Sequence, residues 1–209
     1  MSKFLLEIKA YAVENHIPVI LDETAKLYKT LLQIIMPERI LEIGSAIGYS
    51  SIFAAYTLKE LKELKELNDL NDNKACKIDT IEINGDMCIE ARKNIAKAGM
   101  DDIINVICGD ASDVLKCLDT KYDLIFLDAA KGQYCEFLED CIRLTDAGGL
   151  LISDNVLYKG MIKGGVSVPR RKRTIVSRMN EYIDKITHDS RLRSCIKNIG
   201  DGVALSYRL

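Results

Sequence analysis

The sequence predicts an α/β protein with a doubly wound, mostly parallel sheet. Apolar segments alternate with segments of helical propensity between residues 39 and 153, a pattern typical of parallel strands joined by helices. The first strand, 39–43, runs into a glycine turn and then into a helix. Near the end of the chain, Gly200-Asp201-Gly202 separates two further apolar segments, which is typical of a β-hairpin. We therefore expect seven strands, with the hairpin adding an antiparallel edge.

Two helices are expected before the sheet. Residues 3–15 place apolar side chains at helical spacing, and the chain then reaches Pro18, which stops a helix. The second helix should start at Asp22, whose side chain can cap it, and should stop before Pro37. These two helices could form a lid or an oligomer contact.

Apolar periodicity and glycines indicate the remaining elements. A helix is expected from Tyr49 to about Leu70, in which leucines recur every third residue from position 58. Three residues turn an α-helix by about 300°, so this row of leucines rotates out of any buried face. We expect a solvated helix end and then a loop through 68–73. The other expected strands are 77–83, 103–108, 122–127, 149–153, 192–199 and 203–207, and the other expected helices are 85–98, 111–118 and 132–144.

Length and charge limit the functions that the chain can have. Its 209 residues suit one domain, 1–209, with N-terminal helices in 1–37 and the sheet core in 38–209. The net charge of −2 gives no general attraction to nucleic acids or acidic membranes. Charges interrupt the N-terminal segment, and no apolar run approaches the length of about 20 residues that a membrane span needs. We expect a cytoplasmic protein.

Cysteines and histidines predict no zinc site. The seven cysteines include no Cys-x-x-Cys pair, and their odd number leaves at least one without an internal partner. His16 and His188 are far apart in the sequence. We expect reduced thiols in the core, and histidines that are surface or packing residues.

The glycine turn is the first candidate site. Gly44 and Gly48 lack a β-carbon where a ligand could approach the backbone, and the following helix directs free N–H groups at the same space. The spacing is Gly-x-x-x-Gly, which argues against the pyrophosphate of a dinucleotide. Glu42 would repel phosphate but attract a cationic or hydroxyl-rich ligand. The alternative is that both glycines serve only a tight turn.

This turn resembles motif I of class I S-adenosylmethionine-dependent methyltransferases. The resemblance implies a Rossmann-like fold and a sulfonium cofactor. Glu82 ends the next strand, where a carboxylate can accept hydrogen bonds from both ribose hydroxyls, although it could also be an incidental surface acid. Asp110-Ala111 resembles the segment that lines the adenine, and capping of the following helix by Asp110 is a compatible role.

Oxygen ligands follow two further strands. Asp128 comes after the strand 122–127, and Asp154-Asn155 comes after the strand 149–153. Two carboxylates and one amide suit a hard divalent cation such as Mg²⁺, which would bind a substrate hydroxyl and lower its pKa. Lys131 lies one turn beyond Asp128, where its amine could act as the general base. The alternative for Lys131 is a solvated cation at a helix start.

Together these segments resemble the cation-dependent O-methyltransferases, the group of catechol and caffeoyl-CoA O-methyltransferases, from about Pro18 to the C-terminus. The resemblance implies that Asp128, Asp154 and Asn155 bind the metal. It also implies that Lys131 and Asp128 are catalytic residues. It also suggests a homodimer. The cofactor contacts that it implies are Ile20, Glu42, Gly44, Gly48, Ser50, Glu82, Asp110, Ala111 and Asp128.

A basic run follows the expected metal ligands. After Asn155 the chain has a glycine-rich loop containing Lys159 and then Arg170-Arg171-Lys172-Arg173, a local phosphate-binding surface on a slightly acidic protein. Such a run can also be a solvated helix start. This part of the chain, with Gly200-Asp201-Gly202, most resembles bacterial tRNA 5-hydroxyuridine methyltransferases. The resemblance implies binding of the tRNA anticodon loop through Lys159 and the basic run, and methylation of the 5-hydroxyl of the wobble uridine to 5-methoxyuridine.

Two other functions stay open at this point. O-methylation of a small catechol-like or acyl-CoA phenol would use the same metal site, but it predicts a pocket with aromatic gates, and this chain has no tryptophan and four phenylalanines. The second is a non-catalytic nucleotide-binding domain. The presence of every expected metal ligand and of Lys131 argues against that role.

Overall fold

The computed structural model describes residues 3–66, 76–162 and 167–209. The chain forms two compact units, Met1–Asp110 and Ala111–Leu209, which are described one at a time. Whether residues 1–209 act as one domain stays a prediction. No helix of the described ranges has the length and apolar character needed to cross a membrane.

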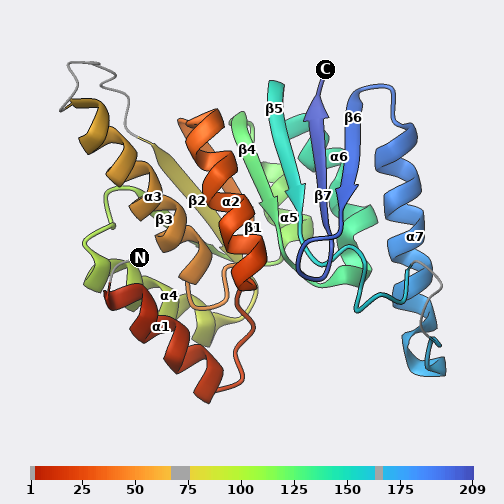
Figure 1. The fold of residues 1–209 in the computed structure, drawn as a ribbon, viewed down its shortest axis with the longest axis horizontal. Coiled ribbons are helices and arrows are strands. Elements are labelled where there is room, and N and C mark those ends of the chain that lie inside the picture. Colours follow the sequence, from red (N-terminus) through yellow and green to blue (C-terminus); the bar gives the residue numbers. More distant parts are fainter. Residues whose placement is uncertain (1–2, 67–75, 163–166) are drawn as a thin grey trace. The chain divides into compact units, whose positions relative to one another are not determined.

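The first unit has a three-stranded parallel sheet (Figure 1). Its strands lie in the order β3-β2-β1, and both neighbouring pairs are parallel. Because parallel strands need crossovers, a helix precedes or follows each strand in sequence. The elements are α1 (Lys3–Glu14), α2 (Asp22–Ile35), β1 (Arg39–Ile43), α3 (Tyr49–Glu66), β2 (Lys77–Glu82), α4 (Gly85–Ala98) and β3 (Ile104–Cys108).

The second unit has a mixed sheet in the order β4-β5-β7-β6 (Figure 1). β4 and β5 are parallel, whereas β7 is antiparallel to both of its neighbours. Its elements are α5 (Ala111–Cys117), β4 (Tyr122–Leu127), the 3₁₀ helix η1 (Lys131–Gln133), α6 (Tyr134–Leu144), β5 (Thr145–Ser153), the 3₁₀ helix η2 (Arg170–Lys172), α7 (Arg173–His188), β6 (Leu192–Lys197) and β7 (Val203–Arg208).

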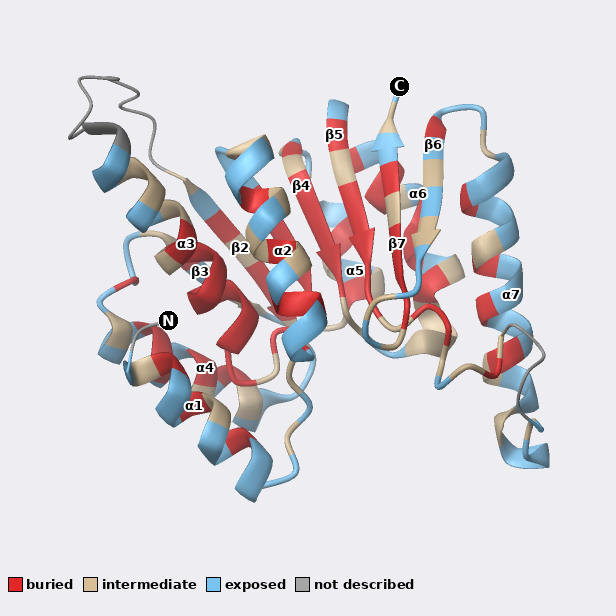
Figure 2. Cartoon of the chain, viewed as in Figure 1, coloured by how far each residue is buried: buried red, intermediate tan, exposed pale blue. Residues whose placement is uncertain are grey.

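The core of each unit lies at its sheet, and β1 and β4 are the most fully buried strands (Figure 2). In β1 every residue after Arg39 is buried, and in β4 five of the six residues are buried. Continuous burial agrees with parallel strands that are covered on both faces. The described residues contain seven strands, and the predicted α/β fold with an antiparallel C-terminal hairpin is confirmed.

A predicted helix cap and a predicted strand start were wrong, although α2 starts at Asp22 as expected. Asp22 does not cap α2, because Leu21 holds the cap position and the Asp22 carboxylate pairs with Lys9. β5 starts at Thr145 rather than at residue 149, so it includes two glycines. A β-carbon on Gly149 would lie 3.0 Å from the Asp123 carbonyl oxygen, so glycine here permits close backbone packing instead of ending the strand.

The row of leucines in α3 behaves as expected. Leu58 and Leu61 are half-buried, and Leu64 is 58% exposed, so the row does leave the core. Leu67, Leu70 and the predicted loop 68–73 lie outside the described residues.

Both histidines lie at the surface, which is one of their two expected roles, whereas core thiols are only partly confirmed. His16 and His188 are exposed. Cys88 and Cys141 are buried, but three cysteines are exposed, which a count of residues cannot reveal. The exposed ones are Cys108, Cys117 and Cys195.

Candidate functional site

The turn between β1 and α3 depends on its glycines. Gly44 and Gly48 have φ values of 104° and 81°, which favour glycine. The N–H groups of Gly44 and Ser45 both donate to the Ile81 carbonyl oxygen, at 2.9 and 3.1 Å, so the turn is tied to β2. A β-carbon on Gly48 would also lie 3.4 Å from the Ala91 side chain of α4. The backbone conformation alone therefore requires both glycines, and their contact with a cofactor stays a prediction.

Glu82 organises this turn through hydrogen bonds to the backbone. One carboxylate oxygen accepts from the Ala46 N–H and the other from the Asn84 N–H, both at 2.8 Å. Ala46 has a positive φ of 44°, so this contact helps to hold an uncommon conformation. Each carboxylate oxygen has a second lone pair, so the group can still accept from two ribose hydroxyls. These contacts do not fit an incidental surface acid.

The other expected cofactor residues of the first unit are mostly buried. Glu42 is 1% exposed and accepts a hydrogen bond from the Thr80 hydroxyl. Burial raises the pKa of Tyr28, and the negative charge of Glu42 raises it further. Ile20 and Ser50 are 3% and 7% exposed, and Asp110 is half-buried. The roles of these residues toward a cofactor stay predictions.

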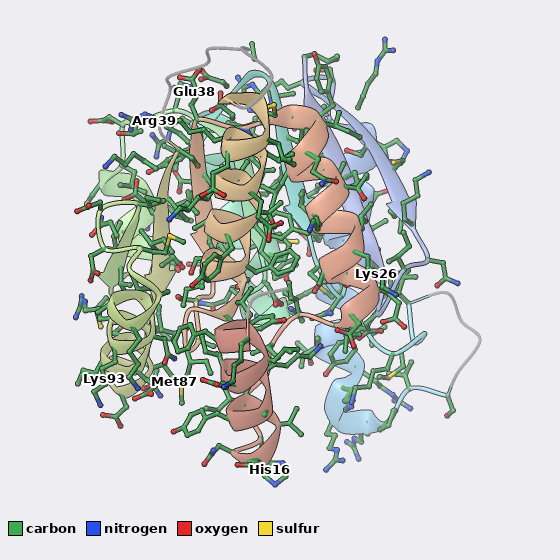
Figure 3. All side chains as sticks on the ribbon, turned by 60° about the vertical axis from the view of Figure 1, so that its left-hand side comes forward. His16, Lys26, Glu38, Arg39, Met87 and Lys93 are labelled. Atoms are coloured by element: carbon green, nitrogen blue, oxygen red, sulfur yellow. The ribbon has the colours of Figure 1, made fainter. Side chains whose placement is uncertain are left out.

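A hollow of about 280 Å³ lies beside the glycine turn in the first unit. It is lined by Ile47 of the turn, by residues near α1 such as Tyr11 and Ile17, and by one side of α4. Figure 3 labels Met87 and Lys93 on α4, which belong to this lining, and His16 at the end of α1. No local pattern predicted this hollow, because its lining combines segments that are distant in the chain.

In the second unit, the register of β4 and β5 brings the expected metal ligands together. Leu127 pairs with Ser153, and the Asp154 N–H donates to the Leu127 carbonyl oxygen at 3.0 Å. Since neighbouring strands are about 4.8 Å apart, Asp128 and Asp154 follow the paired residues at the same sheet edge. Asn155 adopts a left-handed conformation with φ 55°, and its N–H donates to the Asp154 carboxylate at 2.8 Å.

The Lys131 side chain points toward the end of the sheet that carries Asp128 rather than into solvent. Its ammonium lies 2.6 Å from the Asp128 carboxylate and 3.0 Å from the Tyr134 hydroxyl, to which it donates. The side chain is 15% exposed, so the alternative of a solvated cation is wrong. The structure pairs Lys131 with Asp128 at one edge, and the role of Lys131 as a general base stays a prediction.

Sequence reasoning missed Tyr134. This residue is fully buried, and its hydroxyl lies 3.0 Å from the carbonyl oxygens of both Leu127 and Asp154. Burial is the main cause of its raised pKa, with the Asp128 charge as the next. A tyrosine three residues after Lys131 was the available signal, but only the fold brings Asp154 to the same hydroxyl.

The C-terminal hairpin turn holds the loop that follows Asn155. The N–H groups of Val156 and Leu157 donate to the carbonyl oxygens of Gly202 and Asp201, at 2.9 and 3.0 Å. The Lys159 N–H donates to the Asp201 carboxylate. The hairpin was predicted correctly, but its second role in fixing this loop was missed.

The basic run lies at the surface of the second unit. Arg170, Arg171 and Arg173 are exposed, as is Lys159. Lys172 is half-buried, with its ammonium 5.3 Å from the centre of the Tyr158 ring. This cation–π contact joins the basic run to the loop that carries Lys159.

The donor set at the β4/β5 edge fits a hard cation. Asp128, Asp154 and Asn155 offer carboxylate and amide oxygens, which Mg²⁺ and similar ions prefer together with water. The edge therefore suits an oxygen-coordinated ion that keeps positions open for a substrate. A group of three or more His, Cys, Asp or Glu side chains that could hold a metal is not found among the described residues, and the Asn155 amide does not belong to that set.

The two units and their strand-end sites define a Rossmann-like methyltransferase fold. A family model for O-methyltransferases matches residues 2–209. The chain therefore belongs to the O-methyltransferase family, and the expected class of enzyme is confirmed.

Individual relatives agree with this family. A caffeoyl-CoA O-methyltransferase from Populus kitakamiensis is 29% identical over 208 residues, which cover 96% of this chain and 82% of that protein. A solved structure from Staphylococcus aureus, named provisionally as a caffeoyl-CoA O-methyltransferase, is 30% identical with a TM-score of 0.86 and covers 100% of this chain and 93% of that one. An O-methyltransferase from Bacillus cereus, solved with S-adenosylhomocysteine, is 23% identical with a TM-score of 0.81 and covers 100% and 92%.

Proposed function

We propose that the chain transfers a methyl group from S-adenosylmethionine to a hydroxyl oxygen that has a second oxygen beside it. The observation that carries this proposal is the β4/β5 register, which sets Asp128 and Asp154 at one edge with Lys131 paired to Asp128. Two adjacent substrate oxygens are the natural ligands for the open positions of a cation at such an edge.

The first unit would hold the cofactor. Its glycine turn exposes backbone, and Glu82 keeps lone pairs for the ribose hydroxyls while it holds Ala46. The likeness to a structure solved with S-adenosylhomocysteine, the product of methyl donation, supports this assignment.

The second unit would hold the substrate. A divalent cation bound by Asp128, Asp154 and Asn155 would supply positive charge that favours the ionised form of the substrate hydroxyl. Lys131 would take the hydroxyl proton on its Nζ atom, which must be neutral at that moment. The contact with Asp128 orients this amine toward the same edge.

The substrate that we favour is 5-hydroxyuridine at the wobble position of tRNA. Its 5-hydroxyl and O4 carbonyl are adjacent, and an unstacked anticodon base can enter a pocket at modest cost. The exposed basic run, joined to the loop after the metal ligands through Lys172 and Tyr158, offers contacts for tRNA phosphates. A small catechol-like or acyl-CoA phenol is the second candidate, because the Populus relative is named for caffeoyl-CoA.

One experiment separates these substrates. Labelled S-adenosylmethionine is incubated with tRNA containing 5-hydroxyuridine, or with catechol, in the presence of Mg²⁺ or EDTA. We expect Mg²⁺-dependent label in tRNA, and a drop of about tenfold or more when Arg170, Arg171 and Arg173 are changed together to Ala. Lys172 stays unchanged because it contacts Tyr158.

Each labelling result leads to a different conclusion about the substrate. Label in catechol alone would assign the chain to small phenols. Label in tRNA that the triple arginine variant retains in full would contradict the role of the basic run. The absence of label in both substrates would contradict the proposed function.

Homodimer formation and a cytoplasmic location also stay proposals. Two apolar side chains of α1 are exposed, Leu6 at 54% and Val13 at 65%. Light scattering of the purified chain would test the dimer directly, and a monomer at micromolar concentration would contradict it.

A further inference from the structure

The Tyr134 hydroxyl connects three segments of the second unit. It accepts from the Lys131 ammonium at 3.0 Å. It lies 3.0 Å from two carbonyl oxygens, those of Leu127 at the end of β4 and of Asp154 after β5. A phenol has one hydrogen, so it donates to one of these carbonyls at a time. All three contacts are next to, or part of, the residues that we assign to catalysis.

The surroundings of Tyr134 make this hydroxyl a fixed point. The residue is fully buried, and its ring packs edge-on against Tyr182 of α7, with ring centres 5.2 Å apart. The Arg178 guanidinium of α7 donates to the Gly132 carbonyl oxygen at 3.0 Å, which fixes the short helix that carries Lys131. The hydroxyl therefore has little freedom to move away from the lysine.

Lys131 has three N–H donors, and the structure uses two of them. One contacts Asp128 and one contacts Tyr134. A lysine side chain has four flexible carbons, so two anchors on different segments restrict the amine far more than one does. In the neutral amine two N–H groups can keep these contacts, and the lone pair takes the third position, from which it can accept the proton of a substrate hydroxyl.

We propose that Tyr134 is the positioning residue of the active site: its hydroxyl holds the Lys131 amine in line with the substrate oxygen and ties it to the strand ends that carry Asp128 and Asp154. This inference rests on the proposed function for the role of Lys131. It needs no contact between Tyr134 and the substrate, since the residue acts through Lys131.

The test uses two variants that each delete one buried phenol hydroxyl. Tyr134→Phe removes the contact with Lys131, whereas Tyr182→Phe removes a hydroxyl that contacts Ser153 at 2.5 Å. Both tyrosines are fully buried and they contact one another, so Tyr182→Phe controls for the general cost of losing such a group. Thermal unfolding of the full-length variants shows whether each one folds.

The first measurement needs no activity. N-hydroxysuccinimide acetate is supplied in limiting amount, and mass spectrometry follows acetylation at Lys131 and at other lysines. Loss of one anchor should raise the rate at Lys131 about fivefold in Tyr134→Phe, and should leave it within twofold in Tyr182→Phe. An unchanged rate at Lys131 in a folded Tyr134→Phe protein would overturn the proposal, even if the wild type methylates nothing.

The second measurement is a double-mutant cycle on turnover. Tyr134→Phe should lower kcat about tenfold while KM for S-adenosylmethionine stays within twofold, and Tyr182→Phe should leave both unchanged. In a Lys131→Met background, Tyr134→Phe should have no further effect, because it acts through that lysine. Equal losses in both backgrounds would show a general structural role and overturn the proposal, as would a normal kcat in the single variant. Absence of turnover in the wild type would contradict the proposed function, and the acetylation result would then decide the role of Tyr134.

Discussion

The ends of the strands that carry the candidate sites expose different kinds of group in the two units. In the first unit, backbone groups form the edge: Gly44, Ala46 and Gly48 have positive φ values, and Glu82 is held by backbone N–H groups. In the second unit, side chains form the edge, through Asp128, Lys131 and Tyr134. A backbone edge offers general donors that suit a cofactor common to many enzymes, whereas a side-chain edge can direct one reaction.

The largest effect is expected from a substitution that changes the side-chain edge of the second unit and leaves the first unit intact. Asp154→Ala should lower methyl transfer by about a thousandfold or more, because it removes a carboxylate that we assign to the cation. Affinity for S-adenosylmethionine should stay within about twofold, since Asp154 is not one of the expected cofactor contacts. Isothermal titration and labelled-methyl transfer measure the two quantities, and EDTA treatment of the wild type should reproduce the variant. A loss of cofactor affinity as large as the loss of turnover would contradict the separation of the two edges.

The second prediction concerns the turn that supports the side-chain edge. A β-carbon on Gly202 would lie 2.2 Å from Leu157 Cγ, and φ is +86°, so Gly202→Ala should lower the free energy of unfolding by about 3 kcal/mol. Gly85→Ala is the matched control, because its β-carbon would meet nothing within 4 Å. That change should be neutral or stabilising by less than about 1 kcal/mol. Urea unfolding of both variants tests this, and equal stabilities would show that the loop yields to the added methyl group.

The third prediction concerns the backbone edge of the first unit, where a smaller effect is expected. Glu82→Gln removes the charge offered to ribose hydroxyls and should weaken S-adenosylmethionine binding about 10- to 100-fold, the range for hydrogen bonds to a charged group. The value of kcat at saturating cofactor should change little, because the second unit is intact. If Glu82→Gln instead lowered kcat with unchanged affinity, Glu82 would belong functionally to the other edge.

The smallest effect is expected from ion pairs away from both edges. Hydrogen bonds from Arg191 lower the pKa values of Glu139 and Asp189, as Lys9 lowers the pKa of Asp22 in the first unit. These carboxylates therefore add stability above the unfolded-state pKa of about 4, and the contribution is lost as the pH falls through the lowered folded-state values. The Glu139 side chain is 72% exposed, so solvent screens this pair.

Arg191→Ala should consequently cost less than about 1 kcal/mol at pH 7. The difference from wild type should shrink below pH 4 and approach zero near pH 2. Urea midpoints across this range give the profile. A difference that grows on acidification would reverse the assigned direction of the pKa shifts.

The sequence by itself determined the fold class, the hairpin and the positions of the strand-end acids. These features depend on local patterns. Strands, helices and glycine turns can each be recognised from residues that are close together in the sequence. Gly99, for example, ends α4 with φ 65°, directly after the expected helix 85–98. Predictions failed where a local signal had two possible meanings, as at Asp22, whose carboxylate pairs with Lys9 instead of capping α2.

Only the tertiary structure decided how the candidate site is held together. The Tyr134 hydroxyl reaches Asp154 across 20 residues of sequence, and Asp201 reaches Lys159 across 42. Contacts of this kind depend on strand register and on the path of a loop, which no local pattern encodes. The sequence thus names the reacting groups, because their chemistry is fixed by residue type, and the fold sets their geometry, because positions are fixed by packing between distant segments.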